Sequence, residues 1–388
     1  MKYRYILDRG NSLAKFIDGV LYIRSKYTDS EDIIFTFKER MFNSIMTFGE
    51  SGTTTDLSPS SSELFNIEQI VVPNGGDNIG GYNFKNVGWV SGNHSLVENQ
   101  VNLKTANCVD YKFFCEEEQM NQEGVVYFGK YINITVENHA FDPRNGNTDG
   151  SLGLLLKEYV WYSVQGASIN VSVAHKRQKN EIIRGYLGMH LVGQTWQEKV
   201  LIPNGQDTSL QDKVNNVRSG NVDEYPNVFR FVTSKTDKSI CLSGRVDNSG
   251  LFAKRNAQTF SYLPDGCVKL VSDKIYHNAV NQVNIDNYNV EDTEFWHGNY
   301  TIFKDNSNVV YDDVNIEFAY IEKDKMKDRL IIDIKDTVKT LILPKNYVGR
   351  ECNIIEKTDS VTVNEMYVHA KGIEIQSTGY GNLILEFT

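Results

Sequence analysis

Four of the seven histidines in this 388-residue chain fall between residues 94 and 190, and they are its best candidates for acid–base chemistry: His94, His139, His175 and His190. The unperturbed pKa of imidazole lies near 6.5, so each side chain can give or take a proton near neutral pH. With tyrosine, arginine and glutamate nearby, such groups can share general acid–base catalysis on a sugar. A single histidine on a strand is more often packed or solvated than catalytic, so only the grouping suggests a site.

Nine residues form the candidate site. The predicted catalytic residues are His94, His175, Tyr162 and His190, and the predicted substrate-binding residues are Asn93, His139, Glu158, Trp161 and Arg177. We expect the three catalytic histidines to approach one another on one concave sheet face, with Tyr162 nearby. The alternative roles for these side chains are ordinary packing, cross-strand pairs and surface charges.

Strands must position these residues, because strand patterns dominate the chain. Apolar and polar residues alternate over 132–136 and 169–173, as in antiparallel strands with one buried face, and His175 continues the apolar parity. The run 154–164 is typical of a long central strand. Residues 31–46 are numerous enough for a helix, but their Ile, Phe and Thr content favours a pair of strands. We therefore predict an all-β fold, with under a tenth of the first domain in helix.

The chain length and a change of pattern near residue 285 indicate two domains. Residues 1–285 are predicted to form a large antiparallel β-sandwich that faces the ligand. Residues 286–388 carry about eight short strands, typical of a small C-terminal β-sandwich or jelly roll.

Composition excludes several classes of partner and cofactor. The formal net charge of -10 would repel a phosphate backbone, so no nucleic-acid partner is expected. No apolar run is long enough to cross a bilayer and the start lacks a signal-peptide pattern, so we expect a soluble protein made in the cytoplasm, without membrane insertion. The cysteines follow no zinc or redox spacing and are expected to be free thiols, although Cys108 and Cys115 could pair across a hairpin.

No cofactor or metal is expected. Nucleophile-elbow, Walker and dinucleotide-binding motifs are absent from the sequence. Residues 145–150 are similar to the oxygen-rich start of a calcium loop, but Leu156 occupies the position of the closing glutamate, so a hairpin turn is the preferred interpretation.

Several segments together resemble a known kind of protein: DNIGGYNFKNVGWVSGNHS at 77–95, KYINITVENH at 130–139, LLKEYVWYSVQGASINVSVAHK at 155–176 and GYLGMHLV at 185–192. They resemble minor structural proteins of tailed bacteriophages. The order of the blocks is also similar to the galactose-mutarotase-like supersandwich of aldose epimerases and several polysaccharide lyases. The resemblance implies a virion protein near the tail tip, homo-oligomeric, with other tail proteins and a host-surface glycan as partners.

The lyases of this architecture imply specific roles. There an asparagine neutralises a uronate while a histidine or tyrosine abstracts the C5 proton. The matching positions here are Asn93 for the first role and His94, His175 or Tyr162 for the second. An Arg–Glu partner set is not evident, so lyase-like cleavage is left open.

Three functions follow as hypotheses. The leading one is a phage tail-associated protein that binds, and in one version cleaves, host-surface polysaccharide. The second is a purely structural virion or adhesion component without catalysis. The third is a cytoplasmic sugar epimerase, which tail genes beside this one would exclude.

Overall fold

The computed structural model describes part of the chain. The described residues are 2–9, 11–28, 30–40, 42–72, 81–145, 153–186, 188–192, 199–202, 206–208, 218–219, 230–234, 241–247, 268–271, 274–277, 280–281, 293–303, 310–311, 316–323, 328–334, 337–342, 352–369, 372–378 and 381–387. Strands account for 62% of the structure and helix for 4%, which confirms the predicted all-β fold and its low helix content.

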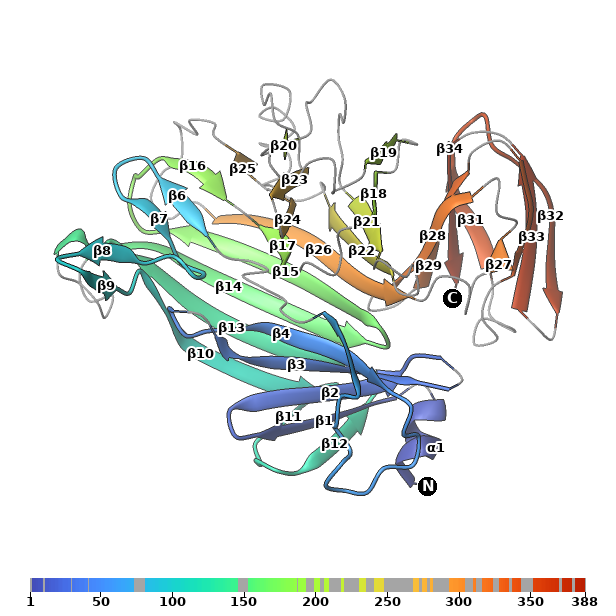
Figure 1. Ribbon diagram of the computed structural model, residues 1–388, viewed down its shortest axis with the longest axis horizontal. Coiled ribbons are helices and arrows are strands. Elements are labelled where there is room, and N and C mark those ends of the chain that lie inside the picture. The colour runs from blue at the N-terminus through green and yellow to red at the C-terminus, as the bar shows by residue number, and fades with distance from the viewer. Residues whose placement is uncertain are drawn as a thin grey trace.

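Two large antiparallel sheets form the main body (Figure 1). The six-stranded sheet has the order β12 (Val126–Gly129), β1 (Ser12–Ile17), β2 (Val20–Lys26), β3 (Asp32–Arg40), β4 (Ile45–Thr54) and β5 (Gln69–Val72). The ten-stranded sheet has the order β11 (Glu118–Gln119), β10 (Ala106–Cys115), β13 (Ile132–Phe141), β14 (Leu154–Gln165), β15 (Ser168–Arg177), β26 (Thr293–Phe303), β22 (Cys241–Asp247), β21 (Arg230–Ser234), β18 (Lys199–Ile202) and β19 (Gln206–Thr208). Residues 31–46 thus form the predicted strand pair, as parts of β3 and β4.

Smaller elements surround these sheets. One four-stranded sheet has the order β25 (Val280–Asn281), β16 (Ile183–Tyr186), β6 (Tyr82–Phe84) and β7 (Gly88–Val90), and a second has β17 (Met189–Val192), β24 (Lys274–His277), β23 (Val268–Val271) and β20 (Arg218–Ser219). The hairpin β8 (Leu96–Glu98) and β9 (Val101–Leu103) projects at one end (Figure 1). The helices are short: α1 (Lys2–Asp8), which the sequence patterns did not predict, and the 3₁₀ turn η1 (Pro143–Asn145).

The last strands form two further four-stranded sheets, orange to red in Figure 1. One has the order β27 (Val310–Tyr311), β30 (Thr337–Ile342), β33 (Gly372–Thr378) and β32 (Thr362–His369), and the other has β28 (Ile316–Lys323), β29 (Asp328–Ile334), β34 (Gly381–Phe387) and β31 (Cys352–Lys357). These two sheets occupy the region of the predicted C-terminal sandwich.

Strand pairing places the change of sheet later than the predicted boundary near residue 285. β26 lies beyond that boundary, yet its residues pair with β15 on one side and β22 on the other, inside the ten-stranded sheet (Figure 1). A cut near 285 would remove a central strand, whereas every strand that the structure describes after Phe303 belongs to the C-terminal sheets. The division into two domains itself stays a prediction.

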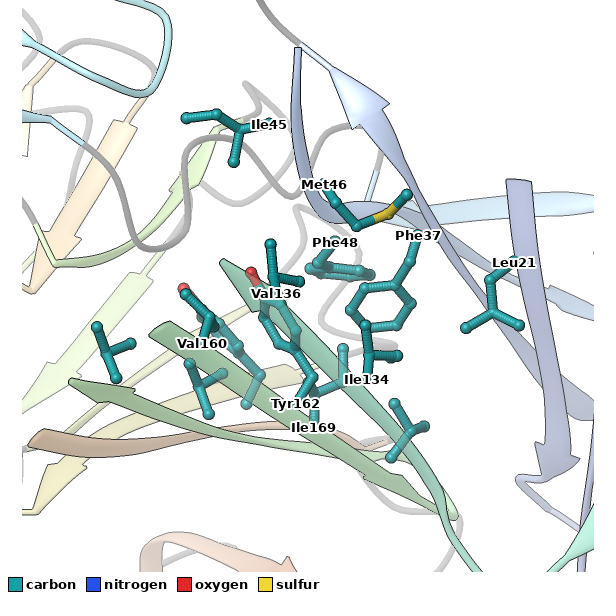
Figure 2. Packing of buried hydrophobic residues seen from close by; sticks show 14 of the residues in the cluster. Leu21, Phe37, Ile45, Met46, Phe48, Ile134, Val136, Val160, Tyr162 and Ile169 are labelled. Carbon is teal, nitrogen blue, oxygen red and sulfur yellow. The ribbon is translucent and has the colours of Figure 1, made fainter. Parts of the chain in front are cut away.

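The core lies between the two large sheets, because each presents alternate apolar side chains to the other. Phe37 of β3 meets Tyr162 of β14 edge-on, with ring centroids 5.1 Å apart, and Ile134 and Val136 of β13 lie beside them (Figure 2). The alternation predicted for 132–136 is confirmed, since its apolar positions are buried and its polar ones are not. The sheet with β6 and β16 adds Tyr82 and other apolar residues to this same core.

Within the described residues, no helix has the length and apolar character that a membrane crossing requires.

Candidate functional site

The candidate residues on β13, β14 and β15 divide between the two faces of the ten-stranded sheet. Successive residues of a strand point to opposite faces. Glu158 and Tyr162 of β14 therefore face inward and are buried, whereas Trp161 between them faces outward with 43% of its surface exposed. On the neighbouring strands His175 faces inward and His139 outward. One cleft cannot hold all of them.

On the inner face, a buried polar cluster consists of Tyr82, Asn138, Glu158, His175 and Tyr186. Register places Asn138, Glu158 and His175 in one row across β13, β14 and β15. The Glu158 carboxylate accepts hydrogen bonds from the Tyr82 hydroxyl and from Asn138 Nδ2, the latter at 2.9 Å. His175 Nε2 lies 2.7 Å from the Tyr82 oxygen and 3.6 Å from Glu158 Oε2. With the phenol donating to the carboxylate, its oxygen accepts from Nε2–H, which fixes the tautomer of His175.

Two aromatic rings close this cluster. Tyr82 and Tyr186 stack with centroids 4.6 Å apart, and the His175 ring stands edge-on to both, at 5.2 and 4.8 Å. Burial raises the pKa of Tyr82 well above its usual value, and the neighbouring Glu158 carboxylate raises it further. The phenol therefore stays neutral and acts as a donor. The cluster joins two sheets, because Tyr82 and Tyr186 belong to the sheet of β6 and β16. All five of its residues are buried, so it offers no surface to a dissolved sugar in this arrangement.

Tyr162 and Arg177 are also interior residues. The Tyr162 hydroxyl lies 3.3 Å from that of Thr47, and burial raises the pKa of Tyr162. Arg177 is buried on the same inner face and donates from Nη1 to the Glu181 carbonyl at 2.8 Å. Both residues link neighbouring segments in the structure, and the catalytic and binding roles predicted for them stay predictions.

On the outer face, Tyr159 and Trp161 form an aromatic platform. Their rings stack with centroids 6.4 Å apart and an interplanar angle of 26°. Thr135 and Ser172 stand opposite Trp161 on the two neighbouring strands, so hydroxyl groups flank the indole on both sides. His139 lies on this same face and its Nε2 is 2.7 Å from Glu137. The platform thus combines the exposed Trp161 ring and the partly buried Tyr159 ring within a polar border.

The remaining candidates lie elsewhere. The His94 ring stacks on that of Trp89, with centroids 5.0 Å apart and an interplanar angle of 20°. The His94 backbone carbonyl accepts hydrogen bonds from Asn43 and Thr105. The exposed Asn93 accepts from the Phe42 backbone amide. His190 lies in β17, opposite Tyr276 of β24 and outside the ten-stranded sheet, and its side chain is outside the described residues. The expected meeting of His94, His175 and His190 on one sheet face is not the arrangement found, because His175 and His190 belong to different sheets and His94 lies in the loop between β7 and β8.

Four partners in these sites were missed from the sequence: Tyr82, Asn138, Tyr159 and Tyr186. Tyr82 and Tyr186 come from short strands with weak patterns, and no local signal indicates that they cover His175. Tyr159 could have been found, since it has the same strand parity as Trp161 two residues away.

The sequence also predicted free thiols and no metal site, and the structure describes some of the residues concerned. Cys108 and Cys115 are free thiols on one strand, as predicted, and burial raises the pKa of each to about 11. Most of the calcium-like segment 145–150 lies outside the described residues. Among those described, no three histidine, cysteine or carboxylate side chains gather as metal ligands would.

Comparisons with known proteins give only distant likenesses. No protein-family model matches the chain, and no curated protein sequence matches it. Among solved structures, it is similar to the galactosidase domain of the α-galactosidase–sucrose kinase AgaSK, with a TM-score of 0.39, 9% identity and coverage of 74% of this chain and 41% of that one. It is also similar to the GH36 α-galactosidase AgaB of Geobacillus stearothermophilus, with a TM-score of 0.39 and 8% identity. That match covers 76% of this chain and 41% of the galactosidase chain.

A third likeness is to a Paenibacillus xanthan lyase, with a TM-score of 0.28, 8% identity and coverage of 96% of this chain and 36% of that one. The chain thus spans about two fifths or less of the length of each of these three proteins. All three are carbohydrate-active proteins by name. At such low scores and identities, neither their activities nor their residue roles transfer to this chain.

Proposed function

We propose that this chain is a glycan-binding protein whose contact surface is the Tyr159–Trp161 platform. The observation that carries the proposal is the exposure of Trp161 on a sheet face, with the partly buried Tyr159 stacked beside it. Since 43% of its surface is in water, the Trp161 side chain is available for contact with a ligand. Sugar rings present flat apolar C–H faces, and an indole with flanking hydroxyls offers both the surface and the hydrogen bonds to match.

Trp161→Ala is the direct test. We expect it to weaken binding of host-surface polysaccharide about tenfold or more, because the loss of a stacked indole at the centre of a contact costs on the order of 2 kcal/mol. Stability should change little, since the side chain is partly in water. Quenching of tryptophan fluorescence, or calorimetric titration with purified capsule or wall polysaccharide, measures the affinity.

Trp89→Ala is the matched control, because Trp89 is a similarly exposed tryptophan on another sheet. Its replacement should leave the affinity for glycan unchanged. Equal affinity of the native chain and Trp161→Ala for every glycan that the native chain binds would refute the platform as the binding surface.

A more specific proposal is that the chain acts as a tail-associated component of a phage virion. It rests on the resemblance of the sequence segments alone. Mass spectrometry of purified particles tests it, because a virion protein remains with the particle through density-gradient purification. Cleavage is a separate question, answered by whether the protein releases unsaturated, ultraviolet-absorbing ends from the same polysaccharide.

A further inference from the structure

The aromatic platform continues into a strip of polar side chains on the outer face of β13. Register places Glu137 opposite Tyr159 and Thr135 opposite Trp161. Directly paired residues of antiparallel strands share a face, with Cβ atoms about 5 Å apart. The aromatic pair and the polar pair therefore lie side by side, within reach of one sugar unit.

The polar groups nearest the two rings have hydrogen-bonding capacity left for a ligand. Thr135 and Glu137 are both partly exposed. The Glu137 carboxylate is held in place by His139, whose Nε2 lies 2.7 Å from Oε1. Among the described residues, no protein group bonds to Glu137 Oε2 or to the Thr135 hydroxyl. Since a carboxylate offers about four acceptor sites, Glu137 can accept further hydrogen bonds beside Tyr159.

The charges around this strip favour a donor of hydrogen bonds over an anion. On the next strand Asp110 stands opposite Glu137, and its carboxylate already holds the Lys112 ammonium at 2.9 Å. An anion placed beside Tyr159 would thus meet two carboxylates at close range. Lys157 is farther from the ring, two residues along β14, which separates the Cα atoms by about 7 Å.

We propose that the platform binds a neutral glycan and that Glu137 is its specificity-determining residue. The sugar ring stacks on Trp161 and Tyr159, and hydroxyl groups on the edge of the ring donate to Glu137 Oε2. Hydrogen bonds from a hydroxyl to a carboxylate are roughly twice as strong as those between neutral groups. This inference rests on the proposed function, since it needs the platform as the binding surface.

The test uses one purified wall polysaccharide in two forms. In the neutral form its carboxyl groups are reduced to alcohols, and in the acidic form its primary hydroxyls are oxidised to carboxylates. The native protein should bind the neutral form about three- to tenfold more tightly at low salt, because the acidic form is repelled by Glu137 and Asp110. Added salt should reduce the difference. Fluorescence titration measures both affinities.

Glu137→Gln is the decisive variant, because it keeps the shape of the side chain and removes its charge. Its affinity for the neutral form should fall about three- to tenfold, since the amide has a single, uncharged acceptor oxygen. Its preference for the neutral form should disappear. Glu98→Gln is the matched control, because Glu98 is an exposed carboxylate on the separate β8–β9 hairpin, and it should keep both the affinity and the preference.

The outcomes separate this inference from the proposed function. Equal or tighter binding of the acidic form by the native protein, lost in Trp161→Ala, would overturn the neutral class and leave the glycan platform standing. An unchanged affinity of Glu137→Gln for the neutral form would overturn the assignment to Glu137. Binding of both forms that is unaffected by Trp161→Ala, or binding of neither form by the native protein, would overturn the platform and this inference with it.

Discussion

Arg24→Ala is expected to lower the free energy of unfolding by about 3–5 kcal/mol, because it leaves a buried carboxylate without its main partner. Arg24 is 1% exposed, and its Nε and Nη2 donate to Asp32 Oδ2 at 3.0 and 2.8 Å. Its Nη1 also donates to the Leu64 carbonyl at 2.7 Å and its Nη2 to that of Asp56. The guanidinium thereby ties β2 and β3 to the segment 56–64.

Urea unfolding measures this change as a shift of the denaturation midpoint, provided that the dependence of the unfolding free energy on urea concentration stays the same. Lys26→Ala is the control on the same strand, because its ammonium lies 3.5 Å from Asp8 and both groups are partly exposed. That replacement should cost less than about 1 kcal/mol. A midpoint for Arg24→Ala equal to that of Lys26→Ala would contradict a structural role for the buried pair.

Asp32, the partner of Arg24, also makes the stability depend on pH. Burial raises the pKa of Asp32 above its ordinary value of 3.8, although Arg24 and Arg4 act in the opposite direction. The folded protein then holds this proton more firmly than the unfolded chain. This carboxyl alone makes stability fall as pH rises from about 3.8 through the folded-state pKa.

The same balance predicts that removing both charges costs less than removing one. Since desolvation exceeds the stabilisation by the arginines, the double variant Arg24→Met/Asp32→Leu should be clearly more stable than Arg24→Ala. Unfolding of the double variant at a lower urea concentration than Arg24→Ala would show instead that Asp32 stabilises the fold even without Arg24, through its ion pair with Arg4.

Local sequence patterns were sufficient to predict which segments form strands and which sheet face their residues occupy. The alternation over 132–136 and 169–173 has a period of two, and burial of Ile134, Val173 and His175 follows from it. The strand pair in 31–46 was also predictable, because β-branched and aromatic residues there outweigh its length. These properties depend on neighbours within a few residues, which a single sequence contains.

Grouping by closeness in sequence was the error in the candidate site. Trp161 and Tyr162 are adjacent in the chain and were assigned to one site, yet alternation sends them to opposite faces of the sheet. The same rule separates His139 from His175. If alternation had been used to compare the candidates on β13, β14 and β15 with one another, the sequence alone would have divided them into a buried group and an outward-facing group.

Pairing between distant segments could not be predicted. β26 follows β15 by more than a hundred residues and still lies beside it, which moves the change of sheet beyond residue 285. Likewise Tyr82 reaches His175 from a different sheet. Such contacts depend on which sheet surfaces are complementary in shape. The residues that flank either partner in the sequence do not indicate this complementarity.

His175→Ala is expected to destabilise the protein by about 3–5 kcal/mol while leaving glycan affinity unchanged. Removal of the imidazole opens a cavity between the rings of Tyr82 and Tyr186 and leaves the Tyr82–Glu158 pair with one polar partner fewer. The outer platform is on the other face of the sheet and should keep its geometry at temperatures where the variant is folded.

Tyr82→Phe is the graded control for the same cluster. It keeps the ring stack with Tyr186 and removes only the hydroxyl that donates to Glu158, so about 1–3 kcal/mol should be lost. Thermal or urea unfolding gives the stabilities, and fluorescence titration of each folded variant gives the affinities.

The measurement also decides between the structural and the catalytic role of His175. A general acid–base residue that is replaced by alanine lowers a reaction rate about a hundredfold or more. If His175→Ala keeps native stability but loses release of unsaturated ends from the polysaccharide, the buried cluster is a catalytic site that opens to substrate. If stability falls and affinity persists, the imidazole instead joins the sheet of β6 and β16 to the ten-stranded sheet, and recognition belongs to the opposite face.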